Sequence, residues 1–282
     1  MRRAIVALAV LAPLAAGCGA QRGNDLSDAQ QAMAKAGTSR IEMSMQAGGK
    51  SFYVATGSMD YEHERGQIFV RPTGDADDWD LPGDVVEGRF IGKTSYFGLV
   101  LAGKQRWVKE EDYDPSGADL FMPGPGGPSP DRVLALLFKS SKEVEVLGKD
   151  DIRGVSAKHY RGHVDPKKLP DSFGEPGELV IDAWIDDDGL VRRLVAPEED
   201  EDGASATTVD LFDFGVPVDV EVPSAAEVIT DEEFMKLLEA ECDARATTKR
   251  KAGDGGLCSA STGYESDSGT TTGPVVTVEA PK

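Results

Sequence analysis

Short segments with alternating apolar and polar side chains place the strongest limit on the fold of this chain. Residues 41–47 alternate with a strict period of two, which predicts a strand buried on one face. Further strands are predicted at residues 52–61, 67–71, 85–91, 94–100, 105–109, 142–147, 155–165, 179–186, 190–195 and 204–214. No helical periodicity alternates with these segments, so the pattern predicts a mainly β, antiparallel sheet and disfavours a parallel βαβ architecture.

Tight-turn residues lie between several of these segments. Gly48 and Gly49 separate the first two strands, so we expect those strands to form a hairpin. Gly92 with Lys93, and the run 187–189 with sequence Asp-Asp-Gly, fit between two further pairs. The chain is therefore expected to run mostly as a meander of hairpins.

Helices are predicted at three places. A short helix ends near Ala36. A second follows the Pro- and Gly-rich loop 123–128, with Ser129 as N-cap, Pro130 at the first helical position and an apolar stripe over 133–138.

The third helix begins at Thr230. Glu233 stands three residues later, as in a capping box. One face of this helix carries Phe234, Leu237, Leu238 and Cys242. We therefore expect Cys242 to point toward the protein interior.

The first eighteen residues have the form of an export signal. Arg2 and Arg3 precede an apolar stretch, 4–15, broken only by Pro13. This stretch is shorter than the roughly 20 apolar residues needed to cross a bilayer. The sequence Leu-Ala-Ala-Gly-Cys at 14–18 resembles the lipobox of bacterial lipoproteins, although Ala15 stands where those proteins most often have Leu.

This resemblance implies that residues 1–17 are removed and that Cys18 receives a diacylglycerol group. Such a protein is anchored through Cys18 at the outer face of the cytoplasmic membrane, and two acyl chains suffice for stable anchoring. An ordinary secretory signal cleaved near Ala20 is the alternative. Residues 18–29 are small and polar, and we expect them to form a flexible tether.

The charge of the chain excludes some classes of partner. The sequence has 50 acidic and 30 basic residues and a formal net charge of −20, which becomes more negative when Arg2 and Arg3 leave with the signal. Such a chain repels phosphate backbones, so no nucleic-acid partner is expected. Anionic headgroups are repelled too, and an acyl anchor would have to hold the protein at the membrane.

Two cysteines remain once Cys18 is assigned to the lipid. Cys242 and Cys258 form an even pair in an oxidising compartment, and we expect a disulfide between them. A metal site is the rival interpretation, but two cysteines without a nearby His or second cysteine pair are poor zinc ligands. No cofactor and no metal are expected.

Other groups of chemically active residues have simpler explanations. His159 and His163 lie on a predicted strand whose other face carries Tyr160 and Val164, so we expect the histidines to face solvent; a weak metal site with Asp165 is the alternative. The acidic run 198–203 imitates the start of an EF-hand loop, but Val209 replaces the required final Glu. We interpret this run and 186–189 as solvated hairpin connections.

No catalytic motif is present. The sequence lacks a Gly-x-Ser-x-Gly elbow, a Ser-x-x-Lys motif, a P-loop and a dinucleotide-binding fingerprint. Paired carboxylates that meet only in space stay open as an alternative in so acidic a chain. We therefore expect a protein that is not an enzyme.

The order of segments from residue 142 onward resembles a known lipoprotein family. Runs 144–148, 152–155, 159–162, 184–193 and 209–215 are similar to those of the LppX/LprG-type lipoproteins of actinobacteria, relatives in shape of the LolA/LolB carriers. The resemblance spans about residues 30–225. It implies a strongly curved antiparallel sheet that forms an open half-barrel, with helices on its concave face and an apolar cavity that carries a lipid or lipoglycan.

Several apolar residues are candidates to line such a cavity. They are Ile41, Met43, Met45, Leu134, Leu137, Phe138, Leu179, Ile181 and Ile185. The same residues can equally be core, in which case the protein is a non-catalytic envelope interaction or sensory module with a filled interior. An exposed Trp184, on the face opposite Ile181, would favour that alternative. Residues 30–264 are expected to form a single domain, and residues 265–282 a disordered tail.

Overall fold

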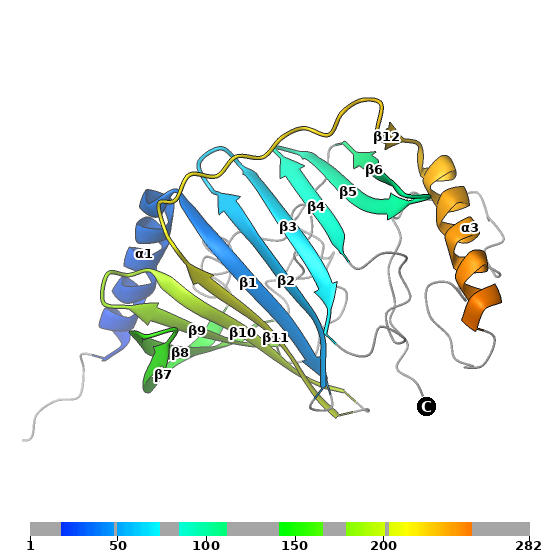
Figure 1. Cartoon of the computed structure of the whole chain (residues 1–282). Coiled ribbons are helices and arrows are strands. Elements are labelled where there is room, and N and C mark those ends of the chain that lie inside the picture. The colour runs from blue at the N-terminus through cyan, green and yellow to red at the C-terminus, as the bar shows by residue number, and fades with distance from the viewer. Residues whose placement is uncertain are drawn as a thin grey trace, which may run out of the picture.

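A single, strongly curved β-sheet dominates the protein (Figure 1). The computed structural model describes residues 18–47, 50–73, 85–111, 141–165, 179–200 and 203–249. The strands are β1 (Thr38–Ala47), β2 (Lys50–Asp60), β3 (Arg65–Pro72), β4 (Val86–Ile91), β5 (Thr94–Leu101), β6 (Lys104–Glu110), β7 (Ser141–Ile152), β8 (Val155–Val164), β9 (Leu179–Asp186), β10 (Val191–Asp200), β11 (Gly203–Phe212) and β12 (Val228–Ile229). Their order in space is β12-β6-β5-β4-β3-β2-β1-β11-β10-β9-β8-β7, an open half-barrel with separate edges.

The predicted antiparallel meander is confirmed. β1 pairs with β2, β4 with β5, and β9 with β10, as the turn residues between them predicted. Among the strands that the structure describes, the one parallel pair is β12 with β6, through Val228 opposite Trp107. β12 was not predicted, because two residues are too few to show a periodicity.

One row of apolar side chains crosses the concave face of the sheet. Cross-strand pairing aligns Tyr160, Ala183, Leu194, Val209, Met43, Ala55, Val70 and Val86, from β8 through to β4. Paired residues point to the same face of a sheet. The concave side of eight neighbouring strands is therefore apolar along a continuous line.

Glycines allow close packing beside this row. Gly57 pairs with Ile41 on one side and Ile68 on the other. A Cβ at Gly57 would lie 2.2 Å from the Gln67 carbonyl oxygen and 2.9 Å from the Ile68 side chain. Only glycine fits this approach, which is typical of places where a sheet bends sharply.

Helix α1 (Cys18–Ala36) lies beside β9 and β10, next to the turn that connects them (Figure 1). Ala29 and Met33, one helical turn apart, are 0% and 1% exposed and pack into the concave core. The expected tether over residues 18–29 is wrong, because these residues belong to this helix. Ala29 anchors the helix on the sheet, which residue composition alone did not reveal.

Helix α3 (Asp231–Lys249) covers the other end of the concave face (Figure 1). Its buried residues Phe234, Leu238 and Cys242 pack against Val86, Leu99 and Leu101. The predicted capping box is confirmed: the Glu233 N–H donates to Thr230 Oγ1 at 3.2 Å, and the Thr230 N–H donates to Glu233 Oε2 at 3.2 Å.

Residues 213–227, which we name the crossing segment, connect β11 to β12 along one rim of the sheet (Figure 1, yellow). The Gly215 N–H donates to the Thr38 carbonyl, and Arg89 Nη1 donates to the Glu221 carbonyl at 2.8 Å. At the far end the Trp107 N–H donates to the Glu227 carbonyl. The segment thus ties β1, β4 and β6 together across the strand ends.

Several predictions fall outside the described residues. These are the signal over 1–17, the helix over 129–138, the loop 123–128, Cys258 and the tail 265–282. The disulfide between Cys242 and Cys258 stays a prediction. Among the described residues, no helix has the length and apolar character that crossing a bilayer requires.

Candidate ligand-binding face

The concave face brings together most of the predicted cavity residues that the structure describes. Ile41, Met43, Ile181 and Ile185 are 7%, 3%, 0% and 4% exposed and belong to one apolar cluster, against which Met45 packs. Leu179 pairs with Val164 at the start of β9. Leu134, Leu137 and Phe138 lie outside the described residues.

Other members of this face were not among the predicted cavity residues. Tyr53, Ala55, Ile68, Tyr160, Leu194 and Val209 belong to the same cluster. Their strands were predicted, and period two correctly placed Tyr160 on the buried face. The pairing of β1 with β11, however, joins strands that are far apart in the sequence, and local periodicity does not predict it.

Methionines are concentrated on this face. Met43, Met45 and Met59 come from the sheet and Met33 from α1, out of seven methionines in the chain. The polar groups that approach them do so weakly: Tyr53 Oη lies 3.9 Å from Met43 Sδ, and the Val191 N–H lies 3.4 Å from Met33 Sδ. Unbranched, polarizable side chains of this kind adapt to apolar ligands of variable shape.

The convex face has the opposite character, with charged cross-strand pairs. Arg161 donates two hydrogen bonds of 2.7 Å to its partner Asp182, and these raise the pKa of the Arg161 guanidinium. Arg193 pairs in the same way with Asp210, which raises the pKa of Arg193. The concave face of the sheet is therefore apolar and the convex face charged, as expected for an antiparallel sheet with one face toward the core and one toward solvent.

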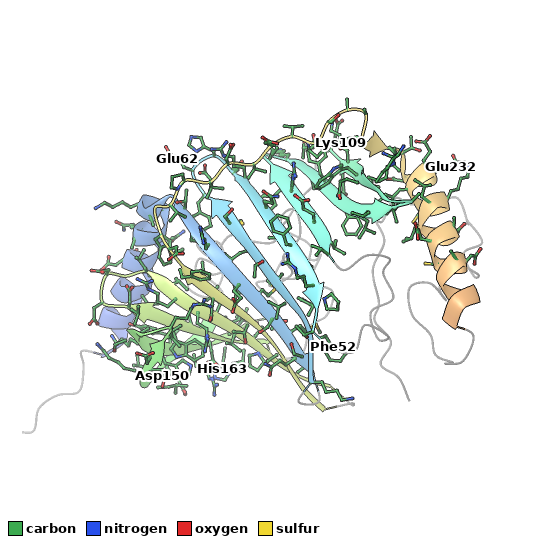
Figure 2. The ribbon with its side chains drawn as sticks, in the orientation of Figure 1. Phe52, Glu62, Lys109, Asp150, His163 and Glu232 are labelled. Atoms are coloured by element: carbon green, nitrogen blue, oxygen red, sulfur yellow. The ribbon has the colours of Figure 1, made fainter. Side chains whose placement is uncertain are left out.

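The expectation of a solvent-exposed His159 is wrong. Its side chain is 14% exposed and stacks on Trp184 with ring centroids 4.0 Å apart, because the two residues are cross-strand partners. Trp184 points to the other face of β9 from Ile181, as predicted, and its Nε1 donates to Asp150 at 2.7 Å. Figure 2 shows Asp150 and His163 at this β7–β8 end of the sheet, with Lys109 and Glu232 at the β6–α3 end.

The acidic runs lie at hairpins. Asp200 pairs with Gly203 at the connection of β10 to β11. Asp186 Oδ1 accepts the N–H groups of Asp188 and Leu190 at 3.0 and 2.8 Å, and Oδ2 accepts Arg192 Nε at 2.6 Å. This carboxylate therefore holds its turn together. Within the described ranges, no group of three or more His, Cys, Asp or Glu could hold a metal ion.

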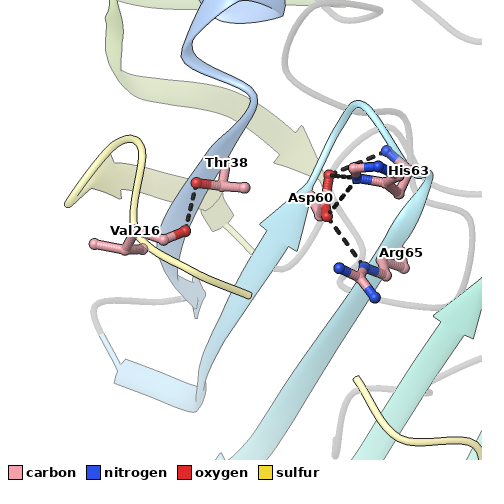
Figure 3. A network of polar contacts seen from close by, with 5 residues as sticks. All are labelled: Thr38, Asp60, His63, Arg65 and Val216. Atoms are coloured by element: carbon pink, nitrogen blue, oxygen red, sulfur yellow. Dashed lines mark hydrogen bonds and ion pairs between the residues drawn. The ribbon is translucent and has the colours of Figure 1, made fainter. Parts of the chain in front are cut away.

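A buried carboxylate lies at the rim where the crossing segment begins (Figure 3). Asp60 accepts hydrogen bonds from the His63 N–H at 3.0 Å and from Arg65 Nε at 3.1 Å, and the His63 ring lies 2.9 Å away. Burial raises the pKa of Asp60, but these three contacts together outweigh it, and the net pKa is lowered. Beside this cluster Thr38 Oγ1 donates to the Val216 carbonyl at 2.6 Å.

A pocket of about 430 Å³ lies where the β7–β8 turn meets the end of β11. Its lining combines Ile152, Val155, Leu211 and Phe212 with the charged side chains of Arg153, Arg192 and Asp213. None of the predicted cavity residues lines it. It touches the concave cluster only through Leu211.

Known proteins resemble this chain in sequence over part of its length. No protein-family model matches the chain. An uncharacterised 31.2 kDa protein in the rplA-rplJ intergenic region of Streptomyces griseus is 30% identical over 121 residues, which is 37% of this chain and 39% of that protein's length. "Putative lipoprotein SCO4650" of Streptomyces coelicolor is 24% identical over 224 residues, which is 74% of this chain and 75% of that protein.

Solved structures define the class of fold. The crystal structure of the Mycobacterium tuberculosis lipoprotein LppX matches with a TM-score of 0.50 at 10% identity, over 72% of this chain and all of that one. LprF from Mycobacterium bovis matches with a TM-score of 0.49 at 16% identity, over 73% and 99% of the two chains. The protein has the LppX-type lipoprotein fold: an open, curved, mainly β half-barrel.

Proposed function

We propose that this protein is a membrane-anchored extracytoplasmic lipoprotein that binds or carries a lipid through its acyl chains, which lie on the concave face. The observation that carries the proposal is the continuous apolar row from β8 to β4, with methionines beside it and helices at both ends. The LppX-type fold supports it. Acylation of Cys18 would hold the protein at the membrane that supplies the cargo.

The driving force would be removal of the acyl chain from water. Each methylene transferred to an apolar surface contributes about 0.8 kcal/mol, so eight of them contribute roughly 6 kcal/mol before the cost of ordering the chain. No cofactor and no bond-breaking step are needed. The same non-specific attraction would accept several acyl chains of similar length.

Photo-crosslinking tests where the acyl chain binds. The full chain with Cys18→Ser, which carries no acyl group of its own, is produced with photo-methionine in place of methionine and illuminated with palmitate. We expect palmitate adducts on peptides that contain Met43 and Met45, and few on Met235, which is 46% exposed on α3. Equal labelling of Met235, or no labelling of Met43 and Met45, would contradict the proposal.

A pair of adjacent substitutions provides the matched control. Met43 faces the concave cluster, whereas its neighbour Ser44 points to the opposite face of β1. Met43→Gln should reduce palmitate capture about fivefold or more, because it places an amide in the acyl path. Ser44→Gln should leave capture unchanged. Equal effects of the two substitutions would instead favour an interaction module with a filled core.

A further inference from the structure

The pocket at the β7–β8 turn has the composition of a ligand site that the acyl-binding proposal does not use. We propose that it binds an oxyanion group carried on a small apolar body. Its volume of about 430 Å³ lies within the range of small-molecule sites. Recognition here would come from guanidinium groups, so this site is independent of the concave face.

The apolar walls of the pocket belong to the sheet. Ile152 and Leu211 are 4% and 1% exposed and belong to the sheet, and Val155 begins β8. Phe212 adds an aromatic ring at the end of β11. These walls suit an alkyl or aromatic body and would not retain a fully hydrated inorganic ion.

Two arginines supply the donors. Arg153 lies with its guanidinium 4.1 Å from the centre of the Phe212 ring and donates one hydrogen bond to Glu42 at 3.2 Å. Arg192 lies 4.9 Å from the Phe214 ring and donates one to Asp186. A guanidinium carries five N–H donors, so both keep donors for a ligand, and the rings and carboxylates hold them in place.

The side chains that line the pocket include two cationic groups and one carboxylate. In a chain with a net charge of −20, Arg153 and Arg192 line the pocket against the single carboxylate of Asp213. That carboxylate is itself 3.7 Å from Arg40 Nε. Both arginines are themselves paired with carboxylates outside the lining: Arg153 Nη1 lies 3.2 Å from Glu42 and 3.7 Å from Asp210, and Arg192 Nε lies 2.6 Å from Asp186. An anion would therefore bind through the N–H donors that these carboxylates leave free.

Backbone strain coincides with the pocket. Among the described non-glycine residues, four have positive φ, and two of them, Arg153 at 55° and Asp213 at 49°, line it. Arg153 occupies the first position of the two-residue β7–β8 turn, where Asn, Asp or Gly would be far less strained. A positive φ at a non-glycine residue often accompanies a functional side chain. Here the residue with positive φ is Arg153, whose guanidinium lies at the pocket.

Calorimetric titration of the full chain with Cys18→Ser tests the proposal, with hexyl phosphate as the probe. We expect saturable binding of hexyl phosphate and none of hexanol at the same concentrations. Binding should be about tenfold weaker with Arg153→Gln, because a charge-assisted hydrogen bond is lost. Inorganic phosphate that binds as tightly as hexyl phosphate would overturn the apolar part of the proposal, and equal binding of hexanol would overturn the anionic part.

Arg71→Gln is the matched control. Arg71 also lies over a phenylalanine ring, Phe69, at 6.0 Å, but it is exposed on β3 and is not part of the pocket. This variant should bind hexyl phosphate as the parent does; a loss equal to that of Arg153→Gln would overturn the site. Met43→Gln should also leave hexyl phosphate binding intact. The hexyl phosphate titration therefore tests the pocket, and the palmitate crosslinking tests the concave face, independently of each other.

Discussion

The charge of Asp60, at the rim of the sheet, makes the stability of the folded state depend on pH. The Asp60 side chain is 5% exposed, and it accepts hydrogen bonds from His63 in the β2–β3 turn and from Arg65, the first residue of β3. The pKa of Asp60 is lowered below its ordinary value of 3.8. The charged form therefore stabilises the folded state above about pH 3.8, and this contribution is lost as the pH falls through the folded-state pKa.

Asp60→Asn should lower the free energy of unfolding by about 1–3 kcal/mol at pH 7, because buried hydrogen bonds to a charged group are lost. The gap between the variant and the parent should narrow as the pH is lowered from 5 toward 3. Urea unfolding at several pH values measures both effects. Glu62→Gln, an exposed position in the same turn, is the control and should change little; a gap independent of pH would contradict the role of the Asp60 charge.

Among the elements, α3 most clearly follows from its own sequence. Thr230 and Glu233 predicted the start of the helix, and the structure has both reciprocal hydrogen bonds. Phe234, Leu238 and Cys242 predicted its buried face. The helix in turn packs on β4 and β5 through Val86, Leu99 and Leu101, so its first turn influences how this end of the concave face is covered.

Thr230→Ala should destabilise the protein by about 1 kcal/mol, because an orphan N–H at the helix start loses its acceptor. The midpoint of thermal unfolding should fall by a few degrees. Glu232→Gln removes an exposed ion pair with Lys236 and one of three acidic charges in the first turn, keeps the cap, and should have a smaller effect. Equal effects of the two substitutions would indicate that the cap contributes no more than surface charge does.

The strands and their hairpin partners were predictable, but the pairing of strands distant in sequence, such as β1 with β11, was not. Period-two alternation depends on local sequence, so β1 to β11 and the buried side of β8 could be predicted. The burial of His159 depends on its cross-strand partner Trp184, and the position of α1 depends on the packing of Ala29 and Met33 against the sheet. Both follow from contacts between residues distant in sequence. The arginine pocket escaped prediction for the same reason, since its lining comes from the ends of four strands, β7, β8, β10 and β11, and from the β7–β8 turn.

At the scale of the whole molecule, the crossing segment and the two helices fix an open sheet at both ends. The segment ties β1, β4 and β6 along one rim, while α1 and α3 cover opposite ends of the concave face. The proposed acyl-binding row lies between them. Because α1 begins at Cys18, and its 19 residues extend about 28 Å and pack beside β9 and β10, an anchor at Cys18 would place this side of the sheet nearest the membrane.

Anchoring through Cys18 is the prediction on which this orientation depends. In a host that acylates lipoproteins, the parent chain should incorporate labelled palmitate and enter the detergent phase of a Triton X-114 partition, because two or more acyl chains bind membranes stably. Cys18→Ser should incorporate no label and shift toward the aqueous phase. Cys242→Ser keeps the acylation site and should still incorporate label. Labelling of Cys18→Ser, or equal partitioning of the parent and Cys18→Ser, would show that this cysteine is not the anchor, and the orientation inferred from α1 would then fail.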